Sequence, residues 1–148
     1  MTCQSILTQP PATLSKGTTV AEAMAQLAAT RAATLPVVDA KGHFAGVFGV
    51  REAIGLVLPR AARAQEIQDL SFVGDSLDDL KVRLGAAARD PVSRHMAPHR
   101  TVRPETSLVE ALLLLYRGDA FLPVCDDAGH LVGIATAADC LTRLSEKP

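Results

Sequence analysis

The sequence predicts a mixed α/β fold (α+β), in which two copies of one βαββα unit pack with pseudo-twofold symmetry. The main observation is an internal repeat: residues 35–46 return as residues 122–133, and seven of the twelve positions are identical. Upstream of this block, residues 19–23 return as residues 107–111. Because self-similarity in the same order marks a duplicated structural unit, both halves of the chain are expected to adopt the same fold.

Each repeat is expected to open with a short lead-in strand followed by a helix. The lead-in strands are predicted at residues 13–14 and 101–102. Thr19 and Ser107 are typical N-cap residues, and an S/T-x-x-E capping box is completed by the glutamate three positions after each of them. The residues that follow place apolar side chains at i, i+3, i+4 and i+7, the spacing of a helix with one buried face.

A hairpin and a second helix complete each repeat. The strands are predicted at residues 35–38, 44–48, 122–125 and 131–135. An Asp-x-x-Gly turn lies between the paired strands of each repeat and favours a tight hairpin. The closing helices are predicted near residues 51–58 and 137–144.

These elements divide the chain into a first repeat at residues 1–58, a connector at 59–90 and a second repeat at 91–148. The connector has no counterpart in the other half and is longer than a plain linker needs. It is predicted to be helical at residues 61–68, and again after Ser76, where Leu77, Leu80 and Leu84 form one stripe.

Composition excludes several functional classes. The 148 residues are 48% hydrophobic and 21% charged, as expected of a globular protein. The net charge of −1 provides no basic field for a phosphate backbone, which makes nucleic acid an unlikely partner. No long apolar run or signal peptide is present, and the three cysteines form no CxxC pair. We therefore expect a cytoplasmic protein with reduced thiols.

With these motifs in order, the chain resembles a tandem pair of CBS domains, the modules named after cystathionine beta-synthase and called a Bateman module when paired. The resemblance rests on the Leu-Pro-Val-x-Asp strands, the T/S-x-x-E-A helix starts, the Val-Ser-Arg-His-Met segment at residues 92–96 and the Gly-Ile-x-Thr-x-x-Asp end at residues 133–139. It covers the chain except for residues 59–90. Such pairs commonly bind adenosine-containing ligands such as AMP, ATP or S-adenosylmethionine between the two copies.

By this resemblance, Asp139 would accept hydrogen bonds from ribose hydroxyls and Thr136 would donate one to a phosphate at the helix start. A helix N-terminus favours anions, and a carboxylate suits a diol. The same two residues are also explained by a plain helix cap. The first repeat has Gly49 and Glu52 at the equivalent positions, so we expect one good site and one weak or empty site.

The adenine pocket implied by the resemblance would come from backbone and apolar groups that double as core positions. These positions are Thr101, Val102, Phe121, Leu122, Pro123 and Val124. His95, His99, Arg100 and Arg103 lie near the entry to the second repeat and are interpreted either as phosphate contacts or as a solvated loop.

The leading hypothesis is a stand-alone regulatory module, not an enzyme, that senses an adenosine nucleotide and signals to a regulated protein through its packing. No catalytic motif or metal-ligand spacing appears. AMP, ADP, ATP or S-adenosylmethionine would be a regulatory ligand and not a catalytic cofactor. The alternative is a ligand-free scaffold that docks a partner protein, and both hypotheses include a homodimer. A DNA-linked regulator is a third possibility, with too few basic residues to support it.

Overall fold

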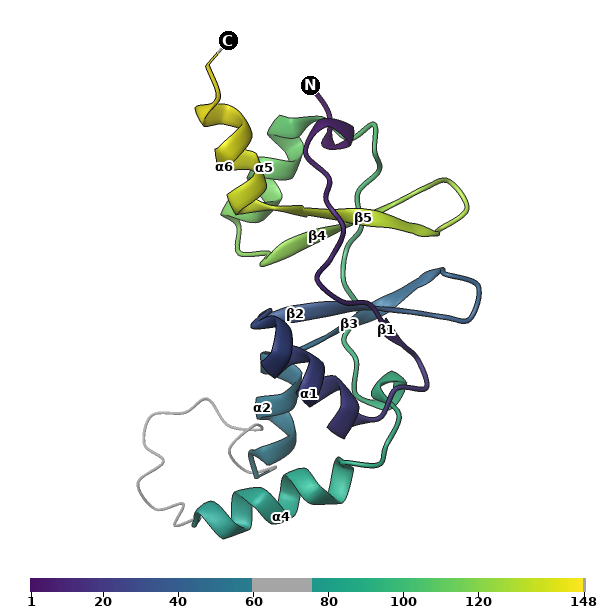
Figure 1. Ribbon diagram of the computed structural model, residues 1–148, viewed down its shortest axis with the longest axis vertical. Coiled ribbons are helices and arrows are strands. Elements are labelled where there is room, and N and C mark those ends of the chain that lie inside the picture. The colour runs from purple at the N-terminus through teal and green to yellow at the C-terminus, as the bar shows by residue number, and fades with distance from the viewer. Residues whose placement is uncertain (60–75, 148) are drawn as a thin grey trace.

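The structure is a computed structural model that describes residues 1–59 and 76–147 (Figure 1). The predicted helix at residues 61–68 lies outside the described residues. The first repeat contains β1 (Leu14–Ser15), α1 (Val20–Thr30), β2 (Thr34–Val38), β3 (Phe44–Gly49) and α2 (Val50–Val57). The connector contributes α4 (Leu77–Ala87). The second repeat contains α5 (Leu108–Tyr116), β4 (Phe121–Cys125), β5 (Leu131–Thr136) and α6 (Ala137–Ser145).

The two repeats face each other through their hairpins, and their helices lie on the outer sides (Figure 1). In the first repeat, β1 runs parallel to β2, and β2 pairs antiparallel with β3. In the second repeat, a parallel bridge from Val102 to Val124 takes the place of β1, and β4 pairs antiparallel with β5. The predicted fold class is therefore confirmed. The first lead-in strand is present one residue later than predicted, whereas the second is reduced to the single bridge at Val102.

The predicted helix starts are also confirmed. The Thr19 hydroxyl accepts a hydrogen bond from the Glu22 N–H, and the Glu22 carboxylate accepts one from the Thr19 N–H, which completes the capping box. Ser107 caps α5 in the same way, although the structure records no return bond from Glu110 within residues 76–147. Ser76 caps α4 through a complete capping box with Asp79, as Thr19 does with Glu22 in α1.

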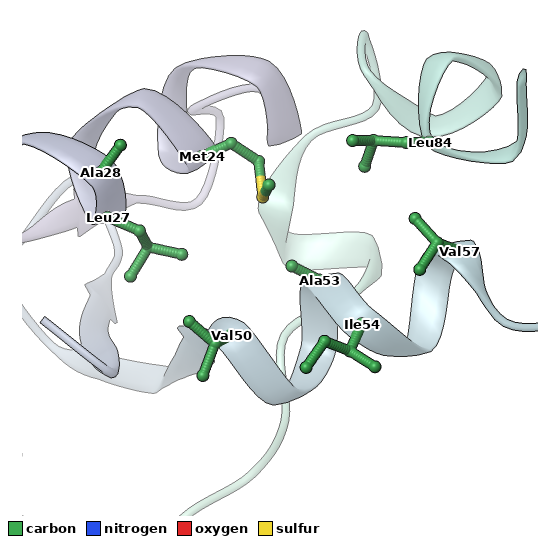
Figure 2. A pocket seen from close by; sticks show the side chains of 8 residues that line it. All are labelled: Met24, Leu27, Ala28, Val50, Ala53, Ile54, Val57 and Leu84. Atoms are coloured by element: carbon green, nitrogen blue, oxygen red, sulfur yellow. The ribbon is translucent and has the colours of Figure 1, made fainter. Parts of the chain in front are cut away.

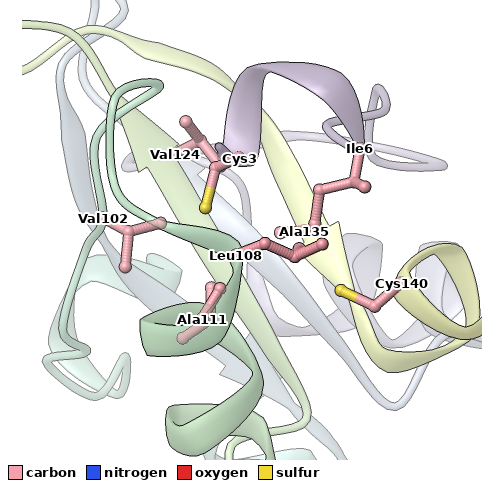
Figure 3. Close-up of a cluster of buried hydrophobic side chains, with 9 residues drawn as sticks. Cys3, Ile6, Val102, Leu108, Ala111, Val124, Ala135 and Cys140 are labelled. Carbon is pink, nitrogen blue, oxygen red and sulfur yellow. The ribbon is translucent and has the colours of Figure 1, made fainter. Parts of the chain in front are cut away.

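Each repeat has its own aliphatic core. In the first repeat, Val20, Leu35, Val37 and Phe48 are fully buried beneath α1 and α2. In the second, Leu108, Ala111, Ala135 and Cys140 lie together between α5, α6 and the hairpin (Figure 3). A smaller cluster containing Val47, Phe121 and Ile134 draws its members from both hairpins and joins the repeats.

The lead-in segments cross between the repeats. Cys3 and Ile6, at the start of the first repeat, are buried in the core of the second. Val92, at the start of the second repeat, is buried in the core of the first. Backbone hydrogen bonds hold both crossings: the Cys3 N–H donates to the Thr106 carbonyl at 2.9 Å, and the Val92 N–H donates to the Thr18 carbonyl at 2.7 Å. The core of each repeat is thus completed by the lead-in segment of the other repeat.

The crossing explains why the repeated block ends in glycine in both copies. A Cβ atom on Gly46 would lie 2.7 Å from the Ala97 carbonyl oxygen, and one on Gly133 would lie 2.9 Å from the Thr8 carbonyl oxygen. Ala97 and Thr8 are the residues at which each crossing segment pairs with the opposite hairpin. A side chain at either glycine would push the crossing segment away from the sheet.

The two hairpin turns also meet. The rings of His43 and His130 stack with their centroids 4.3 Å apart, and the backbones of these two residues form an antiparallel bridge. Within each turn, an aspartate carboxylate accepts a hydrogen bond from the backbone N–H of the histidine at 2.9 Å. The His43 N–H donates to Asp39, and the His130 N–H donates to Asp126. These hydrogen bonds are the main reason why the pKa of each carboxyl group is lowered.

The crossing predicts that Val92→Ala destabilises the protein much more than Val109→Ala. Val92 is fully buried, so losing its methyl groups should lower the free energy of unfolding by about 2 kcal/mol. Val109 is 78% exposed, and its truncation should change this free energy by less than about 0.5 kcal/mol. Urea denaturation followed by circular dichroism measures both values. Equal effects would show that Val92 does not complete the first core.

The turns predict a loss of stability in acid. A carboxyl group whose pKa is lowered by folding stabilises the native state above its unfolded pKa of about 4, and this stabilisation is lost as the pH falls through the folded value. Melting temperature should therefore drop between about pH 4 and pH 2. In the double variant Asp39→Asn and Asp126→Asn the drop should be shallower, because the amide oxygen accepts hydrogen bonds without titrating. An unchanged slope would exclude these two groups as its source.

Candidate functional site

Two cavities lie side by side in the cleft between the repeats. The larger has a volume of about 330 Å³ and the smaller about 220 Å³. Ala33, Thr34 and Ala120 line both. The walls come from both strands of each hairpin, from the turns that precede the hairpins, from the crossing segments and from the starts of α2 and α6. Any molecule in the cleft would therefore contact both repeats.

The smaller cavity contains two of the predicted site residues, Thr136 and Phe121. Thr136 is the N-cap of α6, and its side chain accepts a hydrogen bond from the Asp139 N–H at 3.1 Å. Phe121 starts β4, opposite Thr136 in the hairpin register. Pro11 and Ile134 contribute further apolar surface. This cavity offers a largely apolar space beside a helix N-terminus.

Asp139 lies one turn into α6 and is held in place from two directions. Its Oδ2 atom accepts a hydrogen bond from the Thr136 hydroxyl at 2.7 Å and another from the Thr8 hydroxyl at 3.0 Å. Thr8 belongs to the crossing lead-in of the first repeat, so this carboxylate connects the repeats directly. Among residues 1–59 and 76–147, both side-chain hydrogen bonds recorded for the Asp139 carboxylate end on Oδ2, and Asp139 itself lines neither of the two cavities.

The other predicted site residues lie away from the cavities. Val102 and Val124 are paired by a parallel bridge inside the second core, and Leu122 is fully buried there. Pro123 is fully buried in β4, and Thr101 is exposed. Among the six positions predicted for the adenine pocket, the structure brings only Phe121 next to Thr136. Leu122 and Val124 alternate with Phe121 along β4 and face the core of the second repeat.

The larger cavity lies beside the first-repeat residues Gly49 and Glu52. A Glu52 oxygen accepts a hydrogen bond from the Gly49 N–H at 2.9 Å, so the longer carboxylate caps its own helix. A Cβ atom on Gly49 would lie 2.4 Å from the Ala33 carbonyl oxygen, which leaves no room for the threonine found at the equivalent position in the second repeat. Arg51, Glu52, His99 and Asp119 all line this cavity.

Two of these lining residues form a polar network with Arg100. The Asp119 carboxylate lies 3.2 Å from the Arg100 Nε and 3.8 Å from the His99 Nε2. The His99 ring stacks on Phe121 with centroids 5.8 Å apart. His95, another of the basic residues noted at the start of the second repeat, is not part of this network and pairs with Asp90. Asp119 was not identified from the sequence, since no motif connects it to residues near position 50.

A third cavity, of about 430 Å³, opens between α1, α2 and α4 (Figure 2). Within residues 1–59 and 76–147, all the side chains that line it are apolar, and they include Met24, Leu27, Ile54, Val57 and Leu84. The lining that the structure describes therefore suits an apolar group better than a nucleotide.

The cysteines offer no reactive thiol. Cys3, Cys125 and Cys140 are free and buried. Burial raises the pKa of all three, that of Cys125 to about 11, which leaves little thiolate at neutral pH.

Within residues 1–59 and 76–147, no group of three His, Cys, Asp or Glu side chains is placed to hold a metal ion. No helix in those ranges has the length and hydropathy needed to cross a membrane.

Comparisons with known proteins agree with this architecture. A family model described as CBS domain matches residues 3–58 and 88–146. The chain has no match among curated proteins.

Several solved structures share the fold. CBSX2 from Arabidopsis thaliana is 22% identical to this chain with a TM-score of 0.74, and the match covers 97% of this chain and 93% of CBSX2. The structure of CBSX2 in complex with AMP is 23% identical with a TM-score of 0.71, and the match covers 97% of this chain and 95% of CBSX2. The CBS domain of a membrane protein from Sphaerobacter thermophilus is 26% identical with a TM-score of 0.67, over 96% and 86% of the two chains. MJ1004 from Methanocaldococcus jannaschii is 17% identical with a TM-score of 0.69; the match covers 98% of this chain but spans only 60% of MJ1004.

The close packing at Gly49 predicts opposite effects for two glycine substitutions around α2. Gly49→Ala places a methyl group against the Ala33 backbone and should lower the free energy of unfolding by about 1–3 kcal/mol. Gly55→Ala, in the middle of α2, meets open space and should raise it by about 0.5–1 kcal/mol. Chemical denaturation of both variants measures the difference. A neutral Gly49→Ala would mean that the cleft wall can move at little cost.

Proposed function

Because this chain belongs to the CBS domain family, with the family model matched in both repeats, we propose that it is a regulatory module that senses an adenosine-containing nucleotide in the cleft between them. Its role would be regulatory and not catalytic. The free buried cysteines fit the reducing environment of the cytoplasm, where we expect it to act.

The observation that carries the proposal is the arrangement of Thr136 and Asp139. Thr136 lines a cavity at the start of α6, where backbone N–H groups and the helix dipole favour an anion. Asp139 is oriented by two hydroxyl groups through Oδ2, so Oδ1 can accept a ribose hydroxyl at little cost in side-chain entropy. The apolar wall formed by Phe121 and Ile134 offers a surface for a purine ring.

The AMP complex of CBSX2 supports the choice of ligand. That protein shares the fold over nearly its whole length, and its structure was solved in complex with AMP. AMP is therefore the first ligand to test, followed by ADP, ATP and S-adenosylmethionine.

Signalling would follow from the position of the site. Asp139 contacts Thr8, which belongs to the segment that crosses from the first repeat. A ligand on Asp139 would compete for, or strengthen, a contact that connects the repeats. A ligand shifts a conformational equilibrium only by its difference in affinity for the two states, and a site built from both repeats allows such a difference.

The alternative proposal is a ligand-free scaffold that forms a homodimer and docks a partner through its helices. Large apolar side chains are exposed on α5 and α6, and the apolar cavity lies on the opposite repeat. The exposed side chains include Leu113, Tyr116, Leu141 and Leu144. Such a surface is typical of an interface.

Isothermal titration with AMP, ADP, ATP, NAD and S-adenosylmethionine tests the nucleotide proposal. We expect at least one of them to bind in the micromolar range. Asp139→Asn should weaken that binding about tenfold or more, because it removes the charge that accepts the ribose hydroxyls. Glu105→Gln, which changes an exposed carboxylate that lines neither cavity of the cleft, is the matched control for the folded state.

Binding weaker than millimolar for every ligand, or a wild-type affinity in Asp139→Asn, would reject the nucleotide site at α6. Sedimentation with and without ATP separates the two proposals further. A dimer whose stability does not respond to any nucleotide supports the scaffold.

A further inference from the structure

The connector helix α4 is docked on the first repeat along one of its faces. The side chains on this face are partly or fully buried, and they are Leu80, Arg83, Leu84 and Ala87. Their i, i+3, i+4, i+7 spacing is that of an amphipathic helix with one packed stripe. Leu84 packs against the core of the first repeat and lies across the apolar cavity from Val57 (Figure 2). The connector thus supplies one wall of a cavity whose other walls are α1 and α2.

A single arginine sets the position at which α4 crosses α2. The Arg83 Nη1 donates a hydrogen bond to the carbonyl of Val57, the last residue of α2, at 3.2 Å. The carbonyl groups in the last turn of a helix have no partner within the helix, and they carry partial negative charge, so a guanidinium is favoured there. The docking of α4 therefore combines an apolar stripe with one basic side chain at the end of the covered helix.

The second repeat presents the same helix face without a connector helix on it. By the offsets of the repeat, the α1 and α2 residues that line the apolar cavity correspond to residues on α5 and α6. The largest of these are Leu112, Leu115, Tyr116, Leu141 and Leu144, and these five residues define the α5–α6 face. Leu144 is 57% exposed, whereas its counterpart Val57 is half-buried beside α4. Leu84 has no counterpart in the second repeat, because the connector occurs once in the chain.

We propose that the α5–α6 face binds one amphipathic helix of a partner protein, seated as α4 is seated on the first repeat. The partner helix presents two leucines at i and i+4 to Tyr116, Leu141 and Leu144, with an arginine at i+3 that reaches the carbonyl groups in the last turn of α6. This inference rests on the docking role of the alternative proposal and names the partner for it. It does not depend on a nucleotide in the cleft.

The duplication is the reason for choosing a helix as the occupant. Both faces have the same backbone path and apolar residues at the same positions, so an element that fits one is expected to fit the other. Tyr116, which is 88% exposed, replaces Ala28 and enlarges the apolar surface of the second repeat. A second copy of this chain does not offer its own α4, because Arg83 and Leu84 are already engaged on its first repeat. The helix is therefore assigned to a different protein.

A fluorescent peptide with the α4 sequence, residues 76–90, tests the proposal on the full chain. The peptide keeps the Ser76 capping box, and an isolated helix of about 15 residues is marginally stable, so we expect a Kd of about 100 µM or tighter. Leu141→Ser in the chain should weaken binding about tenfold, because the burial of one leucine is lost. Ile54→Ser, at the equivalent position of α2, is the matched control and should leave the Kd unchanged. Both residues are exposed, Leu141 by 61% and Ile54 by 54%, so both variants should fold.

Changes in the peptide test the stripe and the basic residue separately. Leu80→Ser together with Leu84→Ser should abolish binding, because both apolar contacts are removed. Arg83→Ala should weaken binding about threefold, the effect of losing one cation at a helix C-terminus. Val82→Ser is the control, because Val82 is exposed on the outer side of α4. Fluorescence anisotropy measures all four affinities.

Three results would overturn the inference. The first is the absence of binding up to about 1 mM peptide. The second is binding that is weakened by Ile54→Ser and not by Leu141→Ser, which would show that the peptide exchanges with the chain's own α4. The third is a wild-type dimer that Leu141→Ser converts to a monomer while no peptide binds, which assigns the face to a second copy.

The same variants keep this inference distinct from the functions proposed above. Leu141 lines neither cavity of the cleft, so Leu141→Ser should bind AMP as the wild type does. If the peptide does not bind and sedimentation shows a dimer, the homodimeric scaffold stands and the helix-binding inference fails. If no nucleotide binds and the peptide does, the nucleotide proposal fails and this inference stands.

Discussion

The exchange of lead-in segments is the constraint on which the rest of the structure depends. Cys3 and Ile6 complete the second core, and Val92 completes the first, so neither repeat can bury its apolar side chains alone. The crossing segments lie against Gly46 and Gly133, where any larger residue would collide with backbone. Because both hairpins are held at fixed distances by these segments, the cleft between them has a defined shape.

Duplication produces two equivalent cavities in the cleft between the repeats, and the side chains then decide which groups each cavity can bind. The backbone around Thr136 and the backbone around Gly49 follow the same path, with a strand end leading into a helix. Their cavities nevertheless differ in character, since one is largely apolar with a capping threonine and the other contains charged groups of both signs. A common backbone thus supports two kinds of chemistry.

Most secondary structure could be predicted because its signals are local. The capping residues Thr19, Ser107 and Ser76 mark three helix starts, and the Asp-x-x-Gly turns mark both hairpins. The site was harder to predict. Thr136 lies at a cavity, whereas Val102, Leu122 and Val124 lie in the core, because the same apolar residues satisfy either environment and only the packing of the hairpin decides between them.

The sequence by itself determined that the chain is duplicated, where its helices and strands begin, and which family it resembles. These features depend on residues close together in the chain or on a comparison of one half with the other. Only the tertiary structure decided that the lead-in segments exchange partners, and that Asp119 and His99 lie beside Glu52. Such contacts join residues far apart in sequence, and their geometry depends on how the two repeats pack, which no local pattern of side chains records.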